Sequence, residues 1–232
     1  MTTAHTDTLF KETALAYEEP QSLVSDSEIQ EIIRNIPGLE YRLSYITEAE
    51  ESEFLNWIDE QPWITDLKRR VQHYGWRYDY KARKVDSSMQ IGNLPEPLAN
   101  LADSLRKDGL IASVPDQVIV NEYEPGQGIA RHVDCEPCFG DTILTLTLGS
   151  GCIMDFTEAE RTGDKLAFKK PAEPENKVSV WLEPRSVVSM KGDSRWWWFH
   201  GIAARKSDKW QGQTYKRERR VSLTFRKVIL DR

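Results

Sequence analysis

After Pro115 the sequence consists of short apolar segments separated by turn residues, and this pattern restricts the fold more than any other feature. Within residues 142–148, Leu144, Leu146 and Leu148 share one face of a strand while the intervening threonines share the other. Pro125-Gly126 suits a type II turn between the first two strands. Repeated short strands of this kind are typical of a β-sandwich or barrel. We predict strands at residues 117–124, 129–134, 142–149, 152–156, 165–169, 178–182, 186–191, 196–202 and 219–228.

Three amphipathic segments precede the strands, and we expect them to be helices that support the sheet. The first is capped by Ser25 or Asp26, carries isoleucines at helical spacing and ends at Pro37-Gly38. The second begins with a capping box at residues 47–50, and the third covers about residues 97–107. Eight or nine strands behind a helical layer indicate a mainly β fold with N-terminal helices (α+β), a double-stranded β-helix or jelly roll.

The composition is that of a globular protein with 232 residues, of which 39% are hydrophobic. No apolar run approaches the roughly 20 residues of a membrane-spanning helix, and the first ten residues lack the pattern of a secretory signal. We therefore expect no membrane association and a location in the cytoplasm, the nucleus or both. Three cysteines are too few for a disulfide framework, and their odd number leaves at least one unpaired, so thiols are expected. Cys135-x-x-Cys138 is a weak zinc or redox signal.

The charge is unevenly distributed along the chain, although the formal net charge is -6. Residues 1–60 contain fourteen acidic and three basic residues, whereas residues 68–84 contain seven basic residues and one acid. Residues 205–227 contain nine basic and two acidic residues. A polyanion could bind to these two basic segments, with scattered solvated charge as the alternative interpretation.

An H-x-D pattern at His132 and Asp134 is followed by His200, 66 residues beyond the aspartate. Residues i and i+2 of a strand project to the same side, so the imidazole and the carboxylate can both point inward. Two histidines and one carboxylate on one face of a metal ion are the ligands of non-haem Fe(II) oxygenases, and they leave positions open for a co-substrate and dioxygen. The alternative is a surface His-Asp pair.

The last predicted strand carries a second polar face made of Arg220, Ser222, Thr224 and Arg226, which alternate with apolar residues. Two arginines on a buried face require an anion, because an isolated buried charge is costly. The planar guanidinium fork suits carboxylates, so a dicarboxylate co-substrate would explain this face.

The chain resembles the AlkB family of Fe(II)/2-oxoglutarate dioxygenases over roughly residues 65–228. The resemblance combines N-x-Y at residues 121–123, the H-x-D, the distal histidine and R-x5-R at residues 220–226. It implies Fe(II), 2-oxoglutarate and dioxygen (O2) as cofactor and co-substrates. The implied iron ligands and catalytic residues are His132, Asp134 and His200. The implied 2-oxoglutarate contacts are Asn121, Tyr123, Arg220, Ser222 and Arg226, with Arg220 on the distal carboxylate and Arg226 nearer the metal.

Residues 69–76, 121–129, 146–150 and 154–156 are most similar to the eukaryotic branch that hydroxylates a modified wobble uridine in tRNA. The resemblance therefore implies oxidation of a C–H bond of a modified or alkylated nucleobase in RNA or DNA, as demethylation or hydroxylation, in RNA modification or DNA repair. A protein hydroxylase or demethylase on the same fold is the alternative, and a non-enzymatic binding module is a third class. We expect a monomer with a disordered tail (1–24), a helical extension (25–64) and a dioxygenase domain (65–232).

Aromatic and basic residues alternate within residues 69–81 and predict a substrate lid that stacks a flipped or single-stranded base. Because Tyr74, Trp76, Tyr78 and Tyr80 have the same parity, we expect one shared aromatic face, with a core hairpin as the alternative. The expected substrate-binding residues are Arg69, Tyr74, Trp76 and Tyr78.

Overall fold

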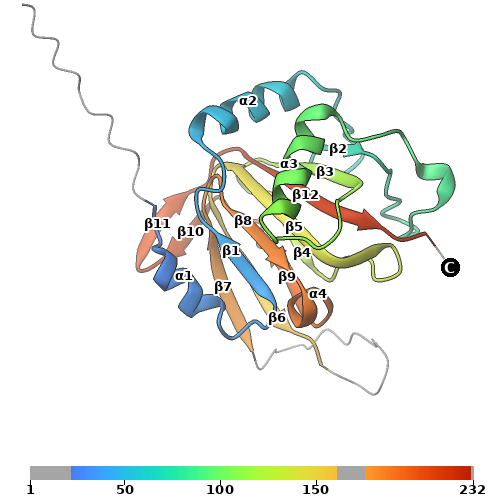
Figure 1. The fold of residues 1–232 in the computed structure, drawn as a ribbon. Coiled ribbons are helices and arrows are strands. Elements are labelled where there is room, and N and C mark those ends of the chain that lie inside the picture. Colours follow the sequence, from blue (N-terminus) through green and yellow to red (C-terminus); the bar gives the residue numbers. More distant parts are fainter. Residues whose placement is uncertain (1–21, 161–175, 231–232) are drawn as a thin grey trace, which may run out of the picture.

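Figure 1 shows the fold in a computed structural model that describes residues 22–160 and 176–230. The strand predicted at 165–169 and nearly all of the predicted tail lie outside these residues. No helix in the described ranges is long and apolar enough to cross a membrane.

Two antiparallel sheets form the body of the protein, and they confirm the predicted mainly β jelly roll. The larger sheet has, in spatial order, the strands β1 (Leu39–Arg42), β8 (Val187–Met190), β5 (Phe139–Gly149), β12 (Arg220–Val228), β3 (Gln117–Tyr123) and β2 (Val71–Tyr74). The smaller sheet has the order β4 (Ile129–His132), β9 (Trp198–Ile202), β6 (Cys152–Glu158) and β7 (Lys177–Leu182). A separate hairpin joins β10 (Ser207–Trp210) to β11 (Gln213–Lys216).

The three predicted helices are present, and the first two begin at the caps that the sequence predicts. In α1 (Asp26–Ile33) and α2 (Glu48–Asp59), the caps Ser25 and Thr47 each accept a hydrogen bond from the N3 backbone and complete a capping box. The third helix, α3, covers Glu96–Lys107. Two short helices complete the described part, a 3-10 turn η1 (Ser87–Met89) and α4 (Gly192–Trp196).

The larger sheet uses the alternation of β5 to separate an apolar face from a polar one. Leu144, Leu146 and Leu148 are fully buried in the same cluster as α2 and α3 residues, and these helices cover that face of the sheet (Figure 1). Thr145 faces the opposite way and lines the cavity between the sheets. The helices therefore pack on the apolar outer face, which leaves the inner face free for polar site residues.

Some elements differ from the sequence prediction. The segment predicted as a strand at 196–202 begins as α4, and β9 starts only at Trp198. Strand β1 pairs with β8, so the segment between α1 and α2 contributes to the larger sheet. Strands β1 and β2 have four residues each, which is too short for a reliable period-2 signal.

The turn expected at Pro125-Gly126 is present. The N–H of Gln127 donates to the carbonyl of Glu124 at 2.9 Å, and Gly126 has φ +96°. A positive φ at the third position is the mark of a type II turn and explains the glycine.

Candidate active site

A cavity of about 360 Å³ lies between the two sheets and collects residues from both of them. Its walls come from β3, β5 and β12 on one side and from β4, β6 and β9 on the other. The segment that follows β2 covers part of it. Among the residues lining it are His132, Asp134, His200, Asn121, Tyr123, Arg220, Ser222, Arg226, Arg69 and Tyr78.

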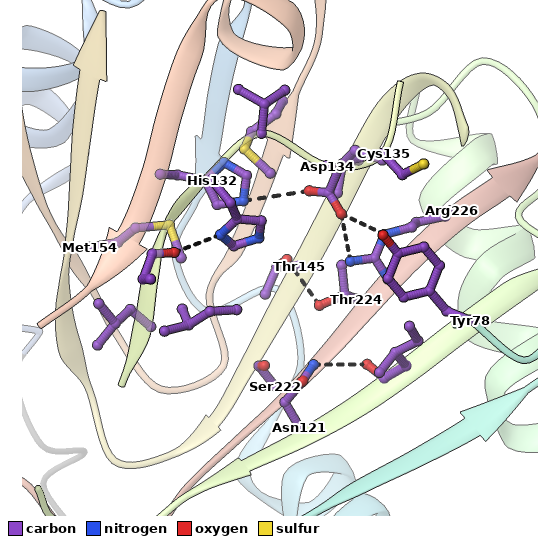
Figure 2. A pocket seen from close by; sticks show the side chains of 18 of the residues that line it. Tyr78, Asn121, His132, Asp134, Cys135, Thr145, Met154, Ser222, Thr224 and Arg226 are labelled. Carbon is purple, nitrogen blue, oxygen red and sulfur yellow. Dashed lines mark hydrogen bonds and ion pairs between the residues drawn. The ribbon is translucent and has the colours of Figure 1, made fainter. Parts of the chain in front are cut away.

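The H-x-D pair and the distal histidine meet at the end of this cavity where β4 pairs with β9. His132 is the register partner of His200, and their ring centroids are 4.5 Å apart. One ligand atom from each of His132, Asp134 and His200 can be chosen so that all lie within 4.8 Å of one another. This spacing allows the three atoms to share one metal ion, and the donor set suits Fe(II). Figure 2 shows His132 and Asp134 pointing into the cavity.

Local contacts orient His132 in a way that suits a metal ligand. Its Nδ1 lies 2.9 Å from the carbonyl oxygen of Ala130, so an Nδ1–H donor leaves the Nε2 lone pair available. Burial, and to a smaller extent the neighbouring His200, lowers the pKa of His132 to about 4. The imidazole is therefore neutral near pH 7, which is the form that binds a metal.

Asp134 has one carboxylate oxygen anchored and the other directed at the histidines. Its Oδ1 accepts a hydrogen bond from Nε of Arg226 at 2.9 Å and forms an ion pair with Nη2 of the same arginine at 2.7 Å. Its Oδ2 lies 3.4 Å from Nε2 of His200. Burial would raise the pKa of Asp134, but the Arg226 charge and the hydrogen bond with His200 outweigh burial and hold the pKa well below its usual range. The carboxylate is thus ionised and held in place.

Arg220 forms a second positive centre, one that has no acidic partner among the described residues. It is 3% exposed, and its Nη2 donates to the hydroxyl of Thr147 at 2.9 Å. Its Nε has no hydrogen-bond partner in the described part of the chain, and neither has Nη1 of Arg226. Buried guanidinium donors without partners are costly unless an anion satisfies them. These orphaned donors fit the carboxylates of 2-oxoglutarate.

The remaining residues expected to contact 2-oxoglutarate lie beside Arg220. Ser222 is the register partner of Asn121 on β3 and of Thr147 on β5. The ring of Tyr123 lies 5.4 Å from the Arg220 guanidinium. The amide oxygen of Asn121 accepts a hydrogen bond from Nε of Arg69 at 2.9 Å. All of them line the cavity, so the structure brings the expected contacts together.

The four aromatic residues of the expected lid do not share one face. Tyr78 and Tyr80 line the cavity, with ring centroids 5.0 Å apart, and Arg69 lines it with them. Tyr74 instead packs on Trp57 at 5.5 Å, and Trp76 is buried in the core. The expectation of a substrate-binding Tyr74 and Trp76 is therefore corrected. The physical reason is that β2 ends at Tyr74 and the chain turns at Gly75, where φ is +75°, so parity is lost.

Sequence reasoning did not assign Arg83 and Thr147 to the site. Arg83 lines the cavity from the segment after β2, where no regular spacing predicts its direction. Thr147 supports Arg220 from β5, and its parity with Thr145 was the signal that could have found it.

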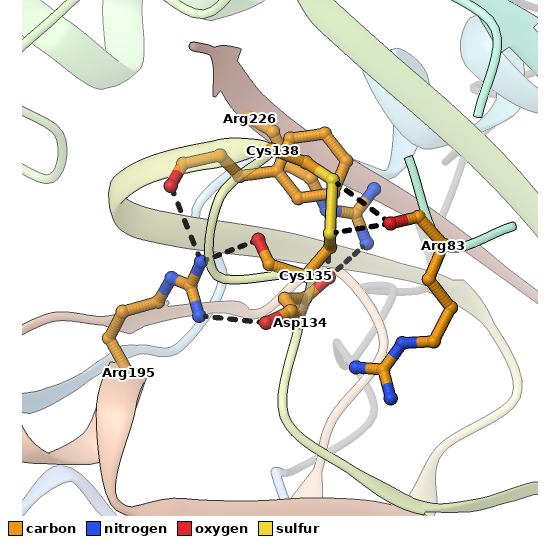
Figure 3. The surroundings of a disulfide bond; sticks show 7 residues. Arg83, Asp134, Cys135, Cys138, Arg195 and Arg226 are labelled. Atoms are coloured by element: carbon orange, nitrogen blue, oxygen red, sulfur yellow. Dashed lines mark hydrogen bonds and ion pairs between the residues drawn. A yellow bond between two sulfur atoms is a disulfide. The ribbon is translucent and has the colours of Figure 1, made fainter. Parts of the chain in front are cut away.

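The two cysteines that follow Asp134 form a disulfide, which corrects the expectation of thiols. Cys135 and Cys138 have Cα atoms 5.3 Å apart, a usual separation for a bonded pair, because a turn brings them together. Only Cys152 is a free cysteine among the described residues. Figure 3 shows this disulfide beside Asp134 and the backbone carbonyl of Arg83.

A jelly roll that holds two histidines and a carboxylate beside unpaired buried arginines belongs to the class of non-haem iron oxygenases with a dicarboxylate co-substrate. Sequence comparison gives the same result, because the family described as 2OG-Fe(II) oxygenase superfamily matches residues 51–226. The chain belongs to this superfamily and is a 2-oxoglutarate-dependent oxygenase. Its cofactor and co-substrates are Fe(II), 2-oxoglutarate and O2.

Two similar proteins have AlkB names, in agreement with the motifs, and one solved structure shares the fold. It is 36% identical to "Alkylated DNA repair protein ALKBH8 homolog" of Arabidopsis thaliana, over 90% of this chain and 62% of that protein. It is also 36% identical to mouse "tRNA (carboxymethyluridine(34)-5-O)-methyltransferase ALKBH8", over 83% of this chain but 30% of that protein. The chain thus spans less than two thirds of either relative. The structure of OsALKBH1 shares the fold, with a TM-score of 0.60, 16% identity and coverage of 82% and 98% of the two chains.

Proposed function

We propose that this protein oxidises a C–H bond of a modified or alkylated base in RNA or DNA, with tRNA as the first substrate to test. The observation that carries the proposal is the wall of Arg69, Tyr78, Tyr80 and Arg83 in the cavity that holds the metal ligands. Aromatic rings can stack on an extruded base, and guanidinium groups can bind phosphate. The names of the two relatives, which concern tRNA and alkylated DNA, support the same substrate class.

When bound, Fe(II) with 2-oxoglutarate and O2 supplies the oxidation that converts C–H to C–OH while 2-oxoglutarate loses CO2 and becomes succinate. His132, Asp134 and His200 would hold the metal. Arg226 keeps Asp134 ionised and fixed in orientation, and Arg220 would bind the distal carboxylate of 2-oxoglutarate. Burial between the sheets keeps bulk water away from these groups, which strengthens each charged contact.

The proposed substrate class is tested by mass spectrometry of nucleosides after incubation with Fe(II), 2-oxoglutarate and either tRNA or short methylated oligonucleotides. We expect a new hydroxylated nucleoside or loss of a methyl group, with succinate formed in equal amount. Asp134→Ala is the control for metal-dependent turnover. Oxidation of peptides without oxidation of any nucleic acid would instead establish the protein hydroxylase alternative.

A salt series adds a second test of the same proposal. Because counterions are released when phosphates are neutralised, nucleic-acid affinity should fall steeply as salt rises. Arg83→Gln should weaken the binding of every nucleic-acid sequence to a similar extent. It should also reduce the slope of log affinity against log salt concentration by about one. An affinity that is independent of salt would contradict phosphate binding by this wall.

We further propose a monomer that acts in the cytoplasm, the nucleus or both. The monomer is supported by the cavity, which is lined on both sides by residues of one chain. The location follows from the proposed substrates, which occur in these compartments. Light scattering of the purified protein and imaging of a tagged copy test the two statements separately.

A further inference from the structure

The carboxylate ligand of the proposed metal site lies on an irregular segment. Strand β4 ends at His132, its pairing with β9 is interrupted by a register shift, and β5 begins only at Phe139. Asp134 therefore has no place in a strand ladder, although His132 and His200 do. A metal ligand on such a segment requires other contacts to fix its backbone, because sub-ångström placement of ligands determines metal affinity.

Arg195 supplies contacts of this kind from α4. It is 2% exposed, and its guanidinium donates to four backbone carbonyls of the segment that begins at Asp134. Figure 3 shows the contacts with the carbonyls of Asp134 and Cys135. The acceptors are the carbonyls of Asp134 at 3.3 Å, Cys135 at 3.4 Å, Phe139 at 3.5 Å and Gly140 at 3.2 Å.

These contacts are unusual for a buried arginine, because none of its partners is a carboxylate in the described part of the chain. Arg217, which is similarly buried, instead binds the carboxylate of Asp208 through Nε at 2.6 Å. Arg195 also lies over the ring of Trp196, at 4.1 Å from the centroid. The buried charge is thus stabilised by carbonyl dipoles and an aromatic face, and all four carbonyls belong to one short segment.

The position of Arg195 in the chain connects the two sides of the metal site. It lies in α4, immediately before β9, and β9 carries His200. Its guanidinium reaches across to the segment that carries Asp134. We propose that Arg195 is a positioning residue that sets the backbone of Asp134 relative to His200 and thereby sets metal affinity. Arg226 orients the carboxylate of the same residue from β12, so the backbone and the side chain of Asp134 are held separately.

The disulfide acts on the same segment but does not replace Arg195. The Cys135–Cys138 bond closes the turn internally, whereas Arg195 ties both ends of the segment to α4. Loss of Arg195 would leave the turn closed but free to move relative to His200.

The inference rests on the proposed metal ligands, and its test is Mn(II) binding by the whole chain, measured by calorimetry and by the signal of free Mn(II) in electron paramagnetic resonance. Lysine in Arg195→Lys keeps the charge but cannot donate to four carbonyls in a planar array. We expect Arg195→Lys to weaken Mn(II) binding about 10- to 100-fold, the range for residues that orient metal ligands. Arg195→Met should weaken it at least as much.

Arg217→Lys is the matched control, because it alters an arginine of similar burial away from the Asp134 segment. All variants are compared at a temperature where circular dichroism shows each of them folded. Arg217→Lys should lower the melting temperature and leave Mn(II) affinity within about twofold of wild type. If Arg195→Met does not fold, Arg195→Lys and Arg195→Gln decide the question.

Wild-type Mn(II) affinity in Arg195→Lys, or an equal loss in Arg217→Lys, would overturn the proposal, because stability alone would then explain the effects. Failure of wild-type protein to bind Mn(II), or unchanged binding in Asp134→Ala, would instead refute the metal ligands themselves. At saturating Fe(II) the Arg195→Lys variant should regain most of its turnover rate, so the effect should be in the KM for Fe(II) more than in kcat.

Discussion

Replacing Arg220 with methionine should have opposite effects on the free protein and on co-substrate binding. The guanidinium is 3% exposed, with one neutral hydrogen bond to Thr147 and an Nε that has no partner among the described residues. A charge buried in this way lowers the stability of the free protein, and replacement of a buried charge by an apolar residue of similar size is often neutral or stabilising. We therefore expect Arg220→Met to unfold with a free energy equal to or above that of wild type when 2-oxoglutarate is absent.

The same change should weaken 2-oxoglutarate binding. A hydrogen bond to a charged group contributes about 1.5 to 3 kcal/mol, so losing the contact with the distal carboxylate should raise Kd about 10- to 140-fold. At a 2-oxoglutarate concentration of about 100 times the wild-type Kd, wild type should gain about 2.7 kcal/mol of stability. A variant with a hundredfold weaker site should gain only about 0.4 kcal/mol.

Urea unfolding with and without 2-oxoglutarate, in the presence of Mn(II), measures both effects in one series. The matched control is Arg217→Lys, which should lose stability but respond to 2-oxoglutarate as wild type does. The reasoning fails if Arg220→Met binds 2-oxoglutarate within twofold of wild type. It also fails if the free variant is several kcal/mol less stable, because Arg220 would then be a structural residue whose charge is already compensated.

Three further predictions follow from the site and its surroundings. Asp134→Ala should abolish iron-dependent succinate formation and leave the circular dichroism spectrum unchanged; full activity would reject its role as a ligand. Burial, with Arg226 nearby, lowers the pKa of His73 to about 4, so stability is retained above pH 6.5 and lost as pH falls. Wild type should lose about 2 kcal/mol more than His73→Gln between pH 7 and pH 5 in urea unfolding, and parallel curves would contradict this. The double change Cys135→Ser, Cys138→Ser should lower stability by about 2 kcal/mol, since the closed loop is short. Denatured wild type should contain one titratable thiol, and three would show that the disulfide is absent.

The parts of the site that depend on period-2 spacing could be predicted from the sequence. Arg220, Ser222 and Arg226 lie on β12, and their parity alone places them on one face. Asn121 pairs in register with Ser222, so two motifs separated by about a hundred residues meet where the strand pattern predicts a sheet. Regular strands carry this information because each residue's direction follows from that of its neighbours.

The lid could not be predicted in the same way, because its residues do not continue one strand. Tyr74 and Tyr78 have the same parity, but Gly75 turns the chain between them with φ +75°. A Cβ at Gly75 would lie 1.8 Å from the carbonyl oxygen of Asp116, the residue before β3, so the two backbones are too close for any other residue at this position. A glycine inside an apparent alternation was the available sign that parity would not persist.

The contacts of Arg195 and the disulfide could not be predicted from the sequence for a different reason. The partners of Arg195 are backbone carbonyls, and every residue has one, so no residue type in the sequence marks them. The count of three cysteines favours thiols, but it contains no information about the turn that places Cys135 and Cys138 in bonding distance. Contacts made by the backbone and by irregular turns have no spacing rule, and they become visible only in the folded structure.

The charges around the cavity explain how an acidic chain can act on a polyanion. Four guanidinium groups line it, those of Arg69, Arg83, Arg220 and Arg226, against one carboxylate, that of Asp134. Arg226 neutralises Asp134 directly, and a divalent metal ion with a doubly charged 2-oxoglutarate adds no net charge. Three positive charges therefore remain when the cofactor and co-substrate are bound. Because fields at close range depend on the nearest charges, the net charge of -6 does not cancel this local excess. A substrate that brings phosphate groups satisfies it, whereas an uncharged peptide leaves it uncompensated, and for this reason the nucleic-acid proposal is the stronger one.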